Sequence, residues 1–397
     1  MRVLMAPGDM RAQPSGTPLV GEGCAGLAAP QVAAALARGW QEARGADVVV
    51  QAPVADGGPG SAQVVPSDMV TVREALQGQG PVGQVREVDL LQLAPASGAG
   101  PGGGRASGRT WFLDAARLVA LPADPAQARQ EAREGTTYGL GAVVAQALRR
   151  TAPADTLLVG LSRSAVHDGG AGAVAALGGV RGGRALVEGR SLGLVLADGV
   201  ALGGMDGAGA GLGMTVGVQE WEAQERDRLA CRHAADLLRV AQTGRLEGLT
   251  VLGDSQPQRL TPTTWGTGAA GGTALVLRAL GAWALPGARV MARLTGLERS
   301  VRRQDLVVTA AGEVYDLLED SPVAVVARAA QGRALPVVLV AGRSLLPRGE
   351  RAGAGVSSVY SLEQPHTDGG GWDAGGEQAL RQRLEEMGAR LARSWSR

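Results

Sequence analysis

The sequence contains no lysine, so all 39 of its basic residues are arginines. Any cation that binds a phosphate or carboxylate must therefore be an arginine, whose planar guanidinium holds oxyanions through paired hydrogen bonds. Aromatic residues make up only 3% of the chain, with one phenylalanine beside 62 glycines. So broad a bias is typical of GC-rich codon usage, and many glycine and alanine positions carry no structural message.

Cysteine and long apolar runs are also scarce. Cys24 and Cys231 are the two cysteines, and their separation matches no metal-ligand spacing, so we expect ordinary small apolar residues at both positions. The apolar run over residues 1–6 is too short for a secretory signal, and no stretch of about 18 apolar residues without charge or glycine predicts a membrane span. The default expectation is a cytoplasmic protein.

The chain has 397 residues and a mass of 40.3 kDa, which is enough for two domains with separate cores. Hydrophobic residues at 45% and charged residues at 19% are typical of a soluble globular protein. The net charge of +1 gives no electrostatic reason to expect nucleic acid or an anionic membrane as a partner. We therefore expect a small-molecule partner, while the oligomeric state is left open.

Both ends of the chain alternate between strand and helix patterns. Strands are expected over residues 2–6, 47–51, 305–309 and 336–341, and helices over 30–43, 322–331 and 377–395. This alternation predicts parallel sheets.

The middle of the chain has weaker patterns. We expect strands over residues 112–119 and 156–160, a helix or turn-helix over 61–76, and a helix over 137–149. Residues 94–104 are rich in glycine, alanine and proline, and residues 203–217 are dominated by glycine. We expect a surface loop at the first of these and mobility at the second.

Two Asp-Gly-Gly motifs each follow a strand-like run. The first lies in PVADGGPGS over residues 53–61 and the second in HDGGAG over 167–172. A carboxylate at the end of a buried strand, followed by glycines, is well placed to hold a metal or a substrate hydroxyl while backbone N–H groups face an anion. Either motif alone is more simply a chain-reversing turn, but the two together favour a binding site.

With its segments in this order, the chain resembles the bacterial glycerate kinase family, which phosphorylates glycerate at the 2-hydroxyl. The similar segments are VLMAPGDMR over residues 3–11 (family IAPDSFKG), VADGGPGS over 54–61 (ADGGEGT), TTYGLG over 136–141 (TSYGTG), VGLSRSAVHDGGAG over 159–172 (GGSATNDGGAG), GTGAAGG over 266–272 (GAGAAGG), LTGL over 294–297 (LTGL) and DLVVT over 305–309 (DLVITGEGR).

The resemblance implies a flavodoxin-like parallel-sheet domain built from residues 1–85 and 300–397, with an inserted α/β domain over 86–299. It implies that substrate and nucleotide meet in a cleft between the two domains. The implied cofactors are ATP and Mg²⁺, and the implied substrate is glycerate or a similar small hydroxy acid.

The implied site residues fall into three groups. The catalytic residues are Asp56 and Asp168, which would hold Mg²⁺ or orient the hydroxyl, and Arg11, which would pair with an oxyanion. The residues implied to bind substrate or phosphate are Gly57, Gly58, Ser164, Gly169, Gly170, Gly268 and Gly271. The implied metal ligands are Asp168 and Asp198.

The chain departs from the family pattern at several charged positions. Gly8 replaces an aspartate, Pro59 a glutamate and His167 an asparagine, and residues 310–316 lack the Glu and Arg of GEGRLD in register. Phosphoryl transfer depends on neutralising phosphate oxygens, so such losses are costly.

The alternative is a non-catalytic homologue that binds a ligand or acts in regulation. A dinucleotide-dependent oxidoreductase is disfavoured, because no Gly-x-Gly-x-x-Gly turn follows the first strand.

Overall fold

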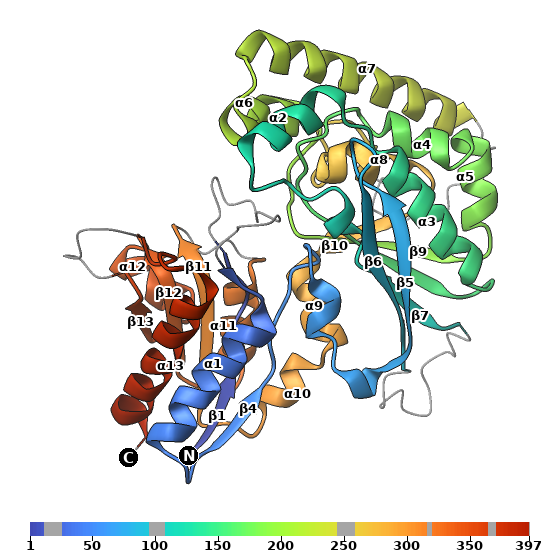
Figure 1. Ribbon diagram of the computed structural model, residues 1–397. Helices are drawn as coiled ribbons and strands as arrows, with labels where there is room; N and C mark the ends of the chain where they lie inside the picture. The colour runs from blue at the N-terminus through green and yellow to red at the C-terminus, as the bar shows by residue number, and fades with distance from the viewer. Residues whose placement is uncertain (12–25, 95–107, 244–258, 316–319, 364–370, 397) are drawn as a thin grey trace. The chain divides into compact units, whose positions relative to one another are not determined.

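The computed structural model describes residues 1–11, 26–94, 108–243, 259–315, 320–363 and 371–396. The chain forms two compact units (Figure 1). The first unit comprises Met1–Asp56, Gln63–Pro66 and Gly287–Arg397, and the second comprises Gly57–Ala62 and Ser67–Pro286. Each unit has its own β-sheet, which confirms the α/β class expected from the sequence.

The sheet of the first unit is parallel and five-stranded, in the order β13-β12-β11-β1-β4. Its strands are β1 (Arg2–Met5), β4 (Val48–Gln51), β11 (Leu306–Val314), β12 (Val337–Ser344) and β13 (Ser358–Ser361). Counted within this unit alone, the order is the 2-1-3-4-5 arrangement of flavodoxin-like folds. The order reverses between β1 and β11, and ligands of this fold class bind beside the carboxyl ends of the strands at that point.

Helices cover both faces of this sheet, because alternate strand residues point to opposite sides. Val3 and Met5 pack in one core with α1 (Ala29–Ala43) and α13 (Gly376–Trp395), which lie side by side in Figure 1. Leu4 packs in the other core. The helices on that second face are α9 (Gly287–Leu294), α10 (Leu297–Val301) and α11 (Pro322–Gln331). The unit also contains α12 (Arg348–Gly353) and the short pair β2 (Met10–Arg11) and β3 (Gly26–Leu27).

The sheet of the second unit has six strands in the order β10-β9-β8-β7-β6-β5. The strands are β5 (Val70–Gln79), β6 (Val85–Leu93), β7 (Thr110–Leu113), β8 (Thr156–Leu161), β9 (Ser191–Leu196) and β10 (Trp283–Pro286). Strands β7 to β10 are parallel, whereas β5 and β6 form an antiparallel hairpin that extends the sheet. The carboxyl ends of β7, β8, β9 and β10 therefore meet at one edge.

The second unit also carries α2 (Pro125–Glu134), α3 (Tyr138–Arg150), α4 (Ala171–Ala176), α5 (Gly179–Val187), α6 (Ala208–Val216), α7 (Glu220–Thr243) and α8 (Thr273–Ala279). Its main core joins the sheet to α3, whose Leu140, Val143 and Val144 are buried at helical spacing. At the start of α2, the side chain of Asp124 accepts a hydrogen bond from the Ala126 N–H, and Pro125 occupies the first turn.

One expectation about local structure is wrong. The segment 61–76 is not helical beyond the short 3₁₀ turns Ser61–Val64 and Ser67–Met69, because β5 begins at Val70 and pairs with β6. The glycine-dominated segment 203–217 contains helix α6. A Cβ atom at Gly209 would lie 2.1 Å from Asp227 Oδ1, so glycine lets α6 approach α7 closely.

Other expectations differ from the structure in the limits of an element or fall on residues outside the described ranges. The strand expected over 112–119 ends at Leu113 and gives way to the 3₁₀ turn Ala115–Leu118. Strand β5, which falls inside the sequence-based limits of the first domain, pairs in the sheet of the second unit. Residues 95–104 of the loop expected over 94–104 lie outside the described residues. None of the helices in the described ranges combines the length and the apolar character that crossing a membrane needs.

Candidate functional site

The carboxyl edge of the second unit's sheet gathers polar groups from three neighbouring strands. Asp114 follows β7, residues 162–170 follow β8, and Asp198 follows β9. Strands β7, β8 and β9 are adjacent and parallel, so these segments emerge next to one another. Most of the site residues expected from the sequence lie at this edge.

Asp168 organises the loop that follows β8. Its Oδ1 accepts hydrogen bonds from the Gly170 N–H at 2.9 Å and the Thr137 hydroxyl at 3.0 Å. Its Oδ2 accepts from the Thr137 N–H at 2.9 Å and the Gly172 N–H at 3.1 Å, and the Thr136 hydroxyl lies 3.4 Å away. Both carboxylate oxygens are therefore saturated, and Asp168 ties the start of α3 to its own turn.

The second glycine-rich turn packs directly on the first. The Gly170 N–H donates to the Gly271 carbonyl oxygen at 3.0 Å, and a Cβ atom at Gly272 would lie 2.6 Å from the Gly169 carbonyl carbon. The Gly268 N–H donates to the Val200 carbonyl oxygen at 3.0 Å, beside the segment after β9. These glycines permit close contact between backbones at the edge of the sheet.

The turn of the first Asp-Gly-Gly motif also reaches this edge. Gly57 has φ +91°, and a Cβ atom there would lie 2.5 Å from the Val195 carbonyl oxygen in β9. Ser61 Oγ accepts from the Gly57 N–H at 3.1 Å and donates to the Gly58 carbonyl oxygen at 2.6 Å. Four segments that resemble family motifs, over 57–61, 136–141, 159–172 and 266–272, are thus joined within one unit.

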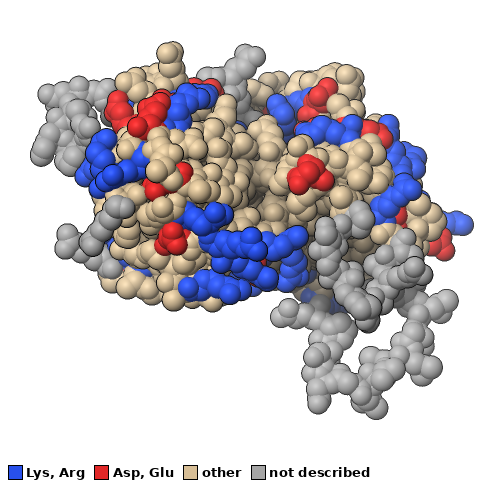
Figure 2. Space-filling model, turned by 90° about the horizontal axis from the view of Figure 1, so that it is seen from below, with Lys and Arg blue, Asp and Glu red and all other residues tan. Residues whose placement is uncertain are grey.

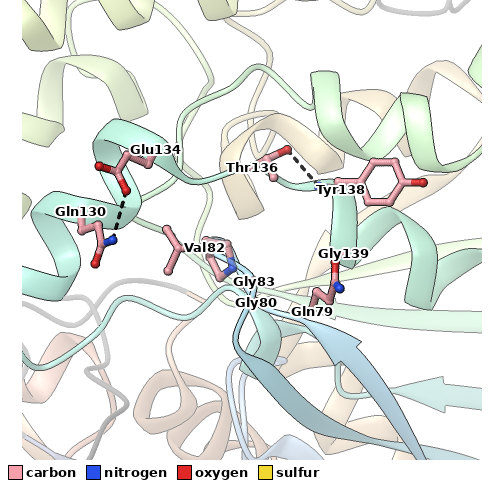
Figure 3. Close-up of a pocket in the computed structure, with 10 residues that line it drawn as sticks. Gln79, Gly80, Val82, Gly83, Gln130, Glu134, Thr136, Tyr138 and Gly139 are labelled. Atoms are coloured by element: carbon pink, nitrogen blue, oxygen red, sulfur yellow. Dashed lines mark hydrogen bonds between the residues drawn. The ribbon is translucent and has the colours of Figure 1, made fainter.

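A pocket of about 410 Å³ opens beside the Asp168 hub (Figure 3). Its walls are the turn between β5 and β6, the end of α2 and the start of α3. Thr136, which contacts Asp168, lines this pocket and accepts a hydrogen bond from the Tyr138 N–H at 3.2 Å. The polar side chains that line it are Gln79, Gln130, Glu134, Thr136 and Tyr138. The pocket therefore offers hydrogen-bonding groups and one carboxylate, but no cation.

Asp198 is engaged by an arginine. Its Oδ2 lies 2.6 Å from Arg163 Nε, and its Oδ1 accepts from the Val200 N–H at 2.9 Å. Within the described ranges, no three His, Cys, Asp or Glu side chains form a cluster fit for a metal ion. Mg²⁺ commonly uses only one or two protein carboxylates together with substrate phosphates, so each carboxylate must be judged separately as a metal ligand. A metal at Asp198 must displace the guanidinium, and one at Asp168 must break its hydrogen bonds.

His167 connects the same loop to α7. Its ring Nε2 lies 3.0 Å from Asp227 Oδ1, and its side chain is 1% exposed. Cys231, one turn further along α7, lies 3.8 Å from the same oxygen. Burial, followed by the charge of Asp227, raises the pKa of the Cys231 thiol to about 11. These contacts clamp α7 against the Asp168 loop.

In the first unit, Arg11 lies close to an acidic residue that sequence reasoning missed. Arg11 Nε is 3.7 Å from Asp9 Oδ2. Burial raises the pKa of Asp9, and the charge of Arg11 partly offsets this effect. The Gly8 N–H donates to the Ala310 carbonyl oxygen at 2.9 Å, so these residues follow β1 beside β11, at the point where the strand order reverses.

The expected residues are thus divided between the units. Arg11 and Asp56 belong to the first unit. The second contains Asp168, Asp198, Gly57, Gly58, Ser164, Gly169, Gly170, Gly268 and Gly271. Ser164 is buried, and its hydroxyl accepts from the Val166 N–H at 3.1 Å, which shapes the loop. Sequence reasoning also missed Thr137 and Asp114, although Thr137 lies inside the TTYGLG motif.

Surface charge is not uniform despite the small net charge. Figure 2 shows arginine side chains gathered near the middle of the face that it draws. Exposed arginines without an ion pair among the described residues include Arg293, Arg299, Arg302 and Arg303, in and after α9 and α10. The expectation that nucleic acid and membranes are not partners stays a prediction.

Comparison with known proteins gives a consistent result. A model described as the glycerate kinase family matches residues 25–192 and 199–395. An uncharacterized protein of Mycobacterium bovis is 30% identical over 369 residues, which cover 91% of this chain and 87% of that protein. Glycerate 2-kinase of Escherichia coli K12 is 30% identical over 152 residues, or 38% of this chain and 36% of that enzyme.

A solved structure shares the architecture. The crystal structure of a candidate glycerate kinase 2 from Salmonella typhimurium LT2 matches with a TM-score of 0.65 and covers 99% of this chain and 98% of that one. The two sequences are 22% identical, so this likeness bears on the fold alone.

Proposed function

The chain belongs to the glycerate kinase family, and on that basis we propose that it transfers the γ-phosphoryl group of ATP to a hydroxyl of glycerate or a similar small hydroxy acid in the cytoplasm. The observation that carries the proposal is the meeting of four motif segments at one sheet edge of the second unit. In this reaction the hydroxyl oxygen forms the new bond to phosphorus, the bond to ADP breaks, and the hydroxyl proton passes to a base or to water.

The arginines supply the positive charge that phosphoryl transfer needs. Arg11 is proposed to pair with the carboxylate of the hydroxy acid or with a phosphate, as a planar donor suits either group. Arg163 stands at the carboxyl edge of β8 and β9 and is proposed to supply a second cation. Its ion pair with Asp198 then opens when nucleotide arrives.

The two acidic residues of the second unit receive different roles in the proposal. Asp168 accepts hydrogen bonds at both oxygens and acts by holding the loop in shape. Asp198 engages a single backbone N–H and a partly exposed guanidinium, so it is the residue that is proposed to turn towards Mg²⁺. When bound with the nucleotide, Mg²⁺ would supply positive charge against its phosphates. Asp56 is proposed to orient the substrate hydroxyl, and Gly57, Gly58 and the other loop glycines to let the ligand approach the backbone.

The alternative is a homologue that binds ligand without turnover. It is favoured by the replacement of charged family residues at Pro59 and Ala311 and by the saturated carboxylate of Asp168. Removing one well-placed electrostatic group costs roughly 100-fold or more in rate, so several losses together are enough to abolish turnover.

Purified protein with ATP, Mg²⁺ and glycerate separates the two. Production of ADP that depends on glycerate supports the kinase, and thermal stabilisation by ligand without ADP supports the binding protein. Arg11→Ala is expected to lose at least 10-fold in kcat/KM, whereas Arg38→Ala, which removes an exposed ion pair between α1 and Glu385 of α13, is a matched control. If no small hydroxy acid leads to production of ADP or to thermal stabilisation of the protein, both functions are contradicted.

A further inference from the structure

The pocket beside the Asp168 hub differs in character from the glycine turns next to it. Its volume of about 410 Å³ falls within the range of about 300–1,000 Å³ that is typical of small-ligand sites. Figure 3 shows Gln130 and Glu134 on one side of the pocket and Gln79 on the other. The lining residues offer amides, hydroxyls and one carboxylate, and none of them is an arginine.

Buried polar contacts hold the walls of this pocket in place. Glu131 of α2 is 0% exposed, and its Oε1 accepts a hydrogen bond from Gln84 Nε2 at 3.0 Å. Gln84 Oε1 in turn accepts from the Val82 N–H at 3.1 Å, which fastens the turn between β5 and β6 to α2. The Thr136 N–H donates to the Pro81 carbonyl oxygen at 3.0 Å and ties the same turn to the start of α3. The pocket is therefore formed before any ligand binds.

The charge of the pocket restricts what it can hold. Arg86 on β6 is paired with Glu131 at 2.9 Å, and Arg133 on α2 is paired with Glu222 of α7 at 3.0 Å. Neither arginine lines the pocket. Phosphates and the carboxylate of a hydroxy acid require cations, whereas the nucleoside part of ATP is uncharged. Among the ligands of the proposed reaction, only the nucleoside matches the pocket.

The pocket also adjoins the second Asp-Gly-Gly turn. A Cβ atom at Gly172 would lie 2.2 Å from Thr136 Oγ1 and 2.5 Å from the Tyr138 backbone nitrogen, so the turn packs directly on the pocket wall. The Thr136 hydroxyl lies 3.4 Å from Asp168 Oδ2. A nucleoside in the pocket would therefore lie next to the turns that are proposed to face its phosphates.

We propose that this pocket binds the nucleoside part of ATP and that Glu134 accepts a hydrogen bond from the ribose. Gln130 Nε2 donates to Glu134 Oε2 at 3.0 Å, which leaves Oε1 to accept from a ligand. Acidic side chains accept from the ribose 2′-hydroxyl in other nucleotide-binding folds. The amides of Gln79 and Gln130 carry both donors and acceptors, as the edge of a nucleobase requires. The inference rests on the proposed function, because it assigns the nucleotide part of that site.

Filling the pocket tests the assignment. Val82→Trp adds bulk at the pocket wall, and Val85→Trp is the matched control, because Val85 lies on the same hairpin, is 70% exposed and does not line the pocket. Calorimetry with Mg²⁺ compares ATP with tripolyphosphate, which carries the charge without the nucleoside. Val82→Trp is expected to weaken ATP binding at least 10-fold and to change tripolyphosphate binding less than about 2-fold, while Val85→Trp changes neither. Unchanged ATP binding in Val82→Trp, or equal loss of both ligands, overturns the inference.

The ribose contact has its own test, which uses a substitution on the surface. The wild type is expected to bind 2′-deoxy-ATP about 10-fold more weakly than ATP, because a hydrogen bond to a charged group is lost. Glu134→Ala is expected to remove this preference, whereas Glu87→Ala, at an exposed position of β6 outside the pocket, keeps it. The same preference in Glu134→Ala as in the wild type overturns the role of Glu134.

The same measurements separate the pocket from the proposed reaction. If ATP binding depends on the pocket but no hydroxy acid gives ADP, the kinase function fails and the nucleoside site stands. If glycerate gives ADP while Val82→Trp binds ATP normally, the kinase stands and the nucleoside site fails. A wild type that does not bind ATP contradicts both.

Discussion

Thr137 holds the Asp168 carboxylate twice, because its backbone N–H and its hydroxyl each lie 2.9 Å from Asp168 Oδ2. The same hydroxyl accepts a hydrogen bond from the Ala173 N–H at 2.9 Å. One fully buried side chain therefore links the start of α3, the Asp-Gly-Gly turn and the start of α4.

Thr137→Val is expected to lower the free energy of unfolding of the second unit by about 1–3 kcal/mol, because it keeps the shape of the side chain but leaves buried hydrogen-bonding groups unpaired. Urea denaturation measures the change. The control is Thr136→Val, whose hydroxyl is exposed and 3.4 Å from Asp168, and it should cost less than about 1 kcal/mol. Equal costs for the two variants would contradict the central role of Thr137.

Gly57→Ala is expected to destabilise the protein more than Gly83→Ala. The two glycines have nearly the same φ, +91° and +92°, so both variants pay a similar backbone cost of roughly 1–2 kcal/mol. A methyl group at Gly57 also meets the Val195 carbonyl oxygen at 2.5 Å, whereas nothing lies within 4 Å at Gly83. The additional overpacking should cost about 1–3 kcal/mol, as measured by the difference in urea midpoints. Equal midpoints would show that the turn does not pack on β9.

Stability should depend on pH through Asp114. Its pKa of about 7 in the folded state lies above the ordinary value of 3.8, so the folded protein binds the proton more tightly. The contribution of this group to stability is full below about pH 4, falls as the pH rises to about 7 and is constant above that, by up to about 4 kcal/mol in total. Urea unfolding from pH 4 to pH 8 should show this slope in the wild type and not in Asp114→Asn. If stability varies with pH in the same way in the wild type and in Asp114→Asn, the pKa of Asp114 is not raised.

Cys231 should react slowly with thiol reagents. Its pKa of about 11, against an ordinary value of 9.0, leaves about 100-fold less thiolate at pH 8. In a Cys24→Ser background, alkylation by iodoacetamide should be slow, and Asp227→Asn should speed it up by removing a neighbouring negative charge. Rapid labelling of the parent protein that Asp227→Asn does not change would contradict this assignment.

The sequence predicted the elements that have strong periodicity or a clear boundary. The expected helix over 30–43 is α1, and the strands expected at both chain ends are β1, β4, β11 and β12. Prediction from the sequence failed where an element is fixed by contacts with other segments of the chain. β5 is largely exposed, so it lacks the apolar alternation of a buried strand and is fixed by pairing with β6. Helix α6 is rich in glycine and depends on packing against α7.

The candidate site shows the same division. The glycine motifs and Asp168 could be identified from sequence, because glycine after a strand and an acidic turn residue leave a local pattern. Asp114 and Asp227 left no such pattern. Their importance comes from Ala62 and His167, which lie 52 and 60 residues away along the chain.

By itself the sequence determined the family, the α/β class and the segments that carry glycine and acid, because these depend on residue identity and order along the chain. Only the tertiary structure decided what each acid contacts: Asp168 is saturated by Thr137, Asp198 is paired with Arg163, and Asp114 is buried with one oxygen unpartnered. The physical reason is that hydrogen bonding, burial and charge depend on neighbours in space, which parallel strands bring to a common edge from distant parts of the chain.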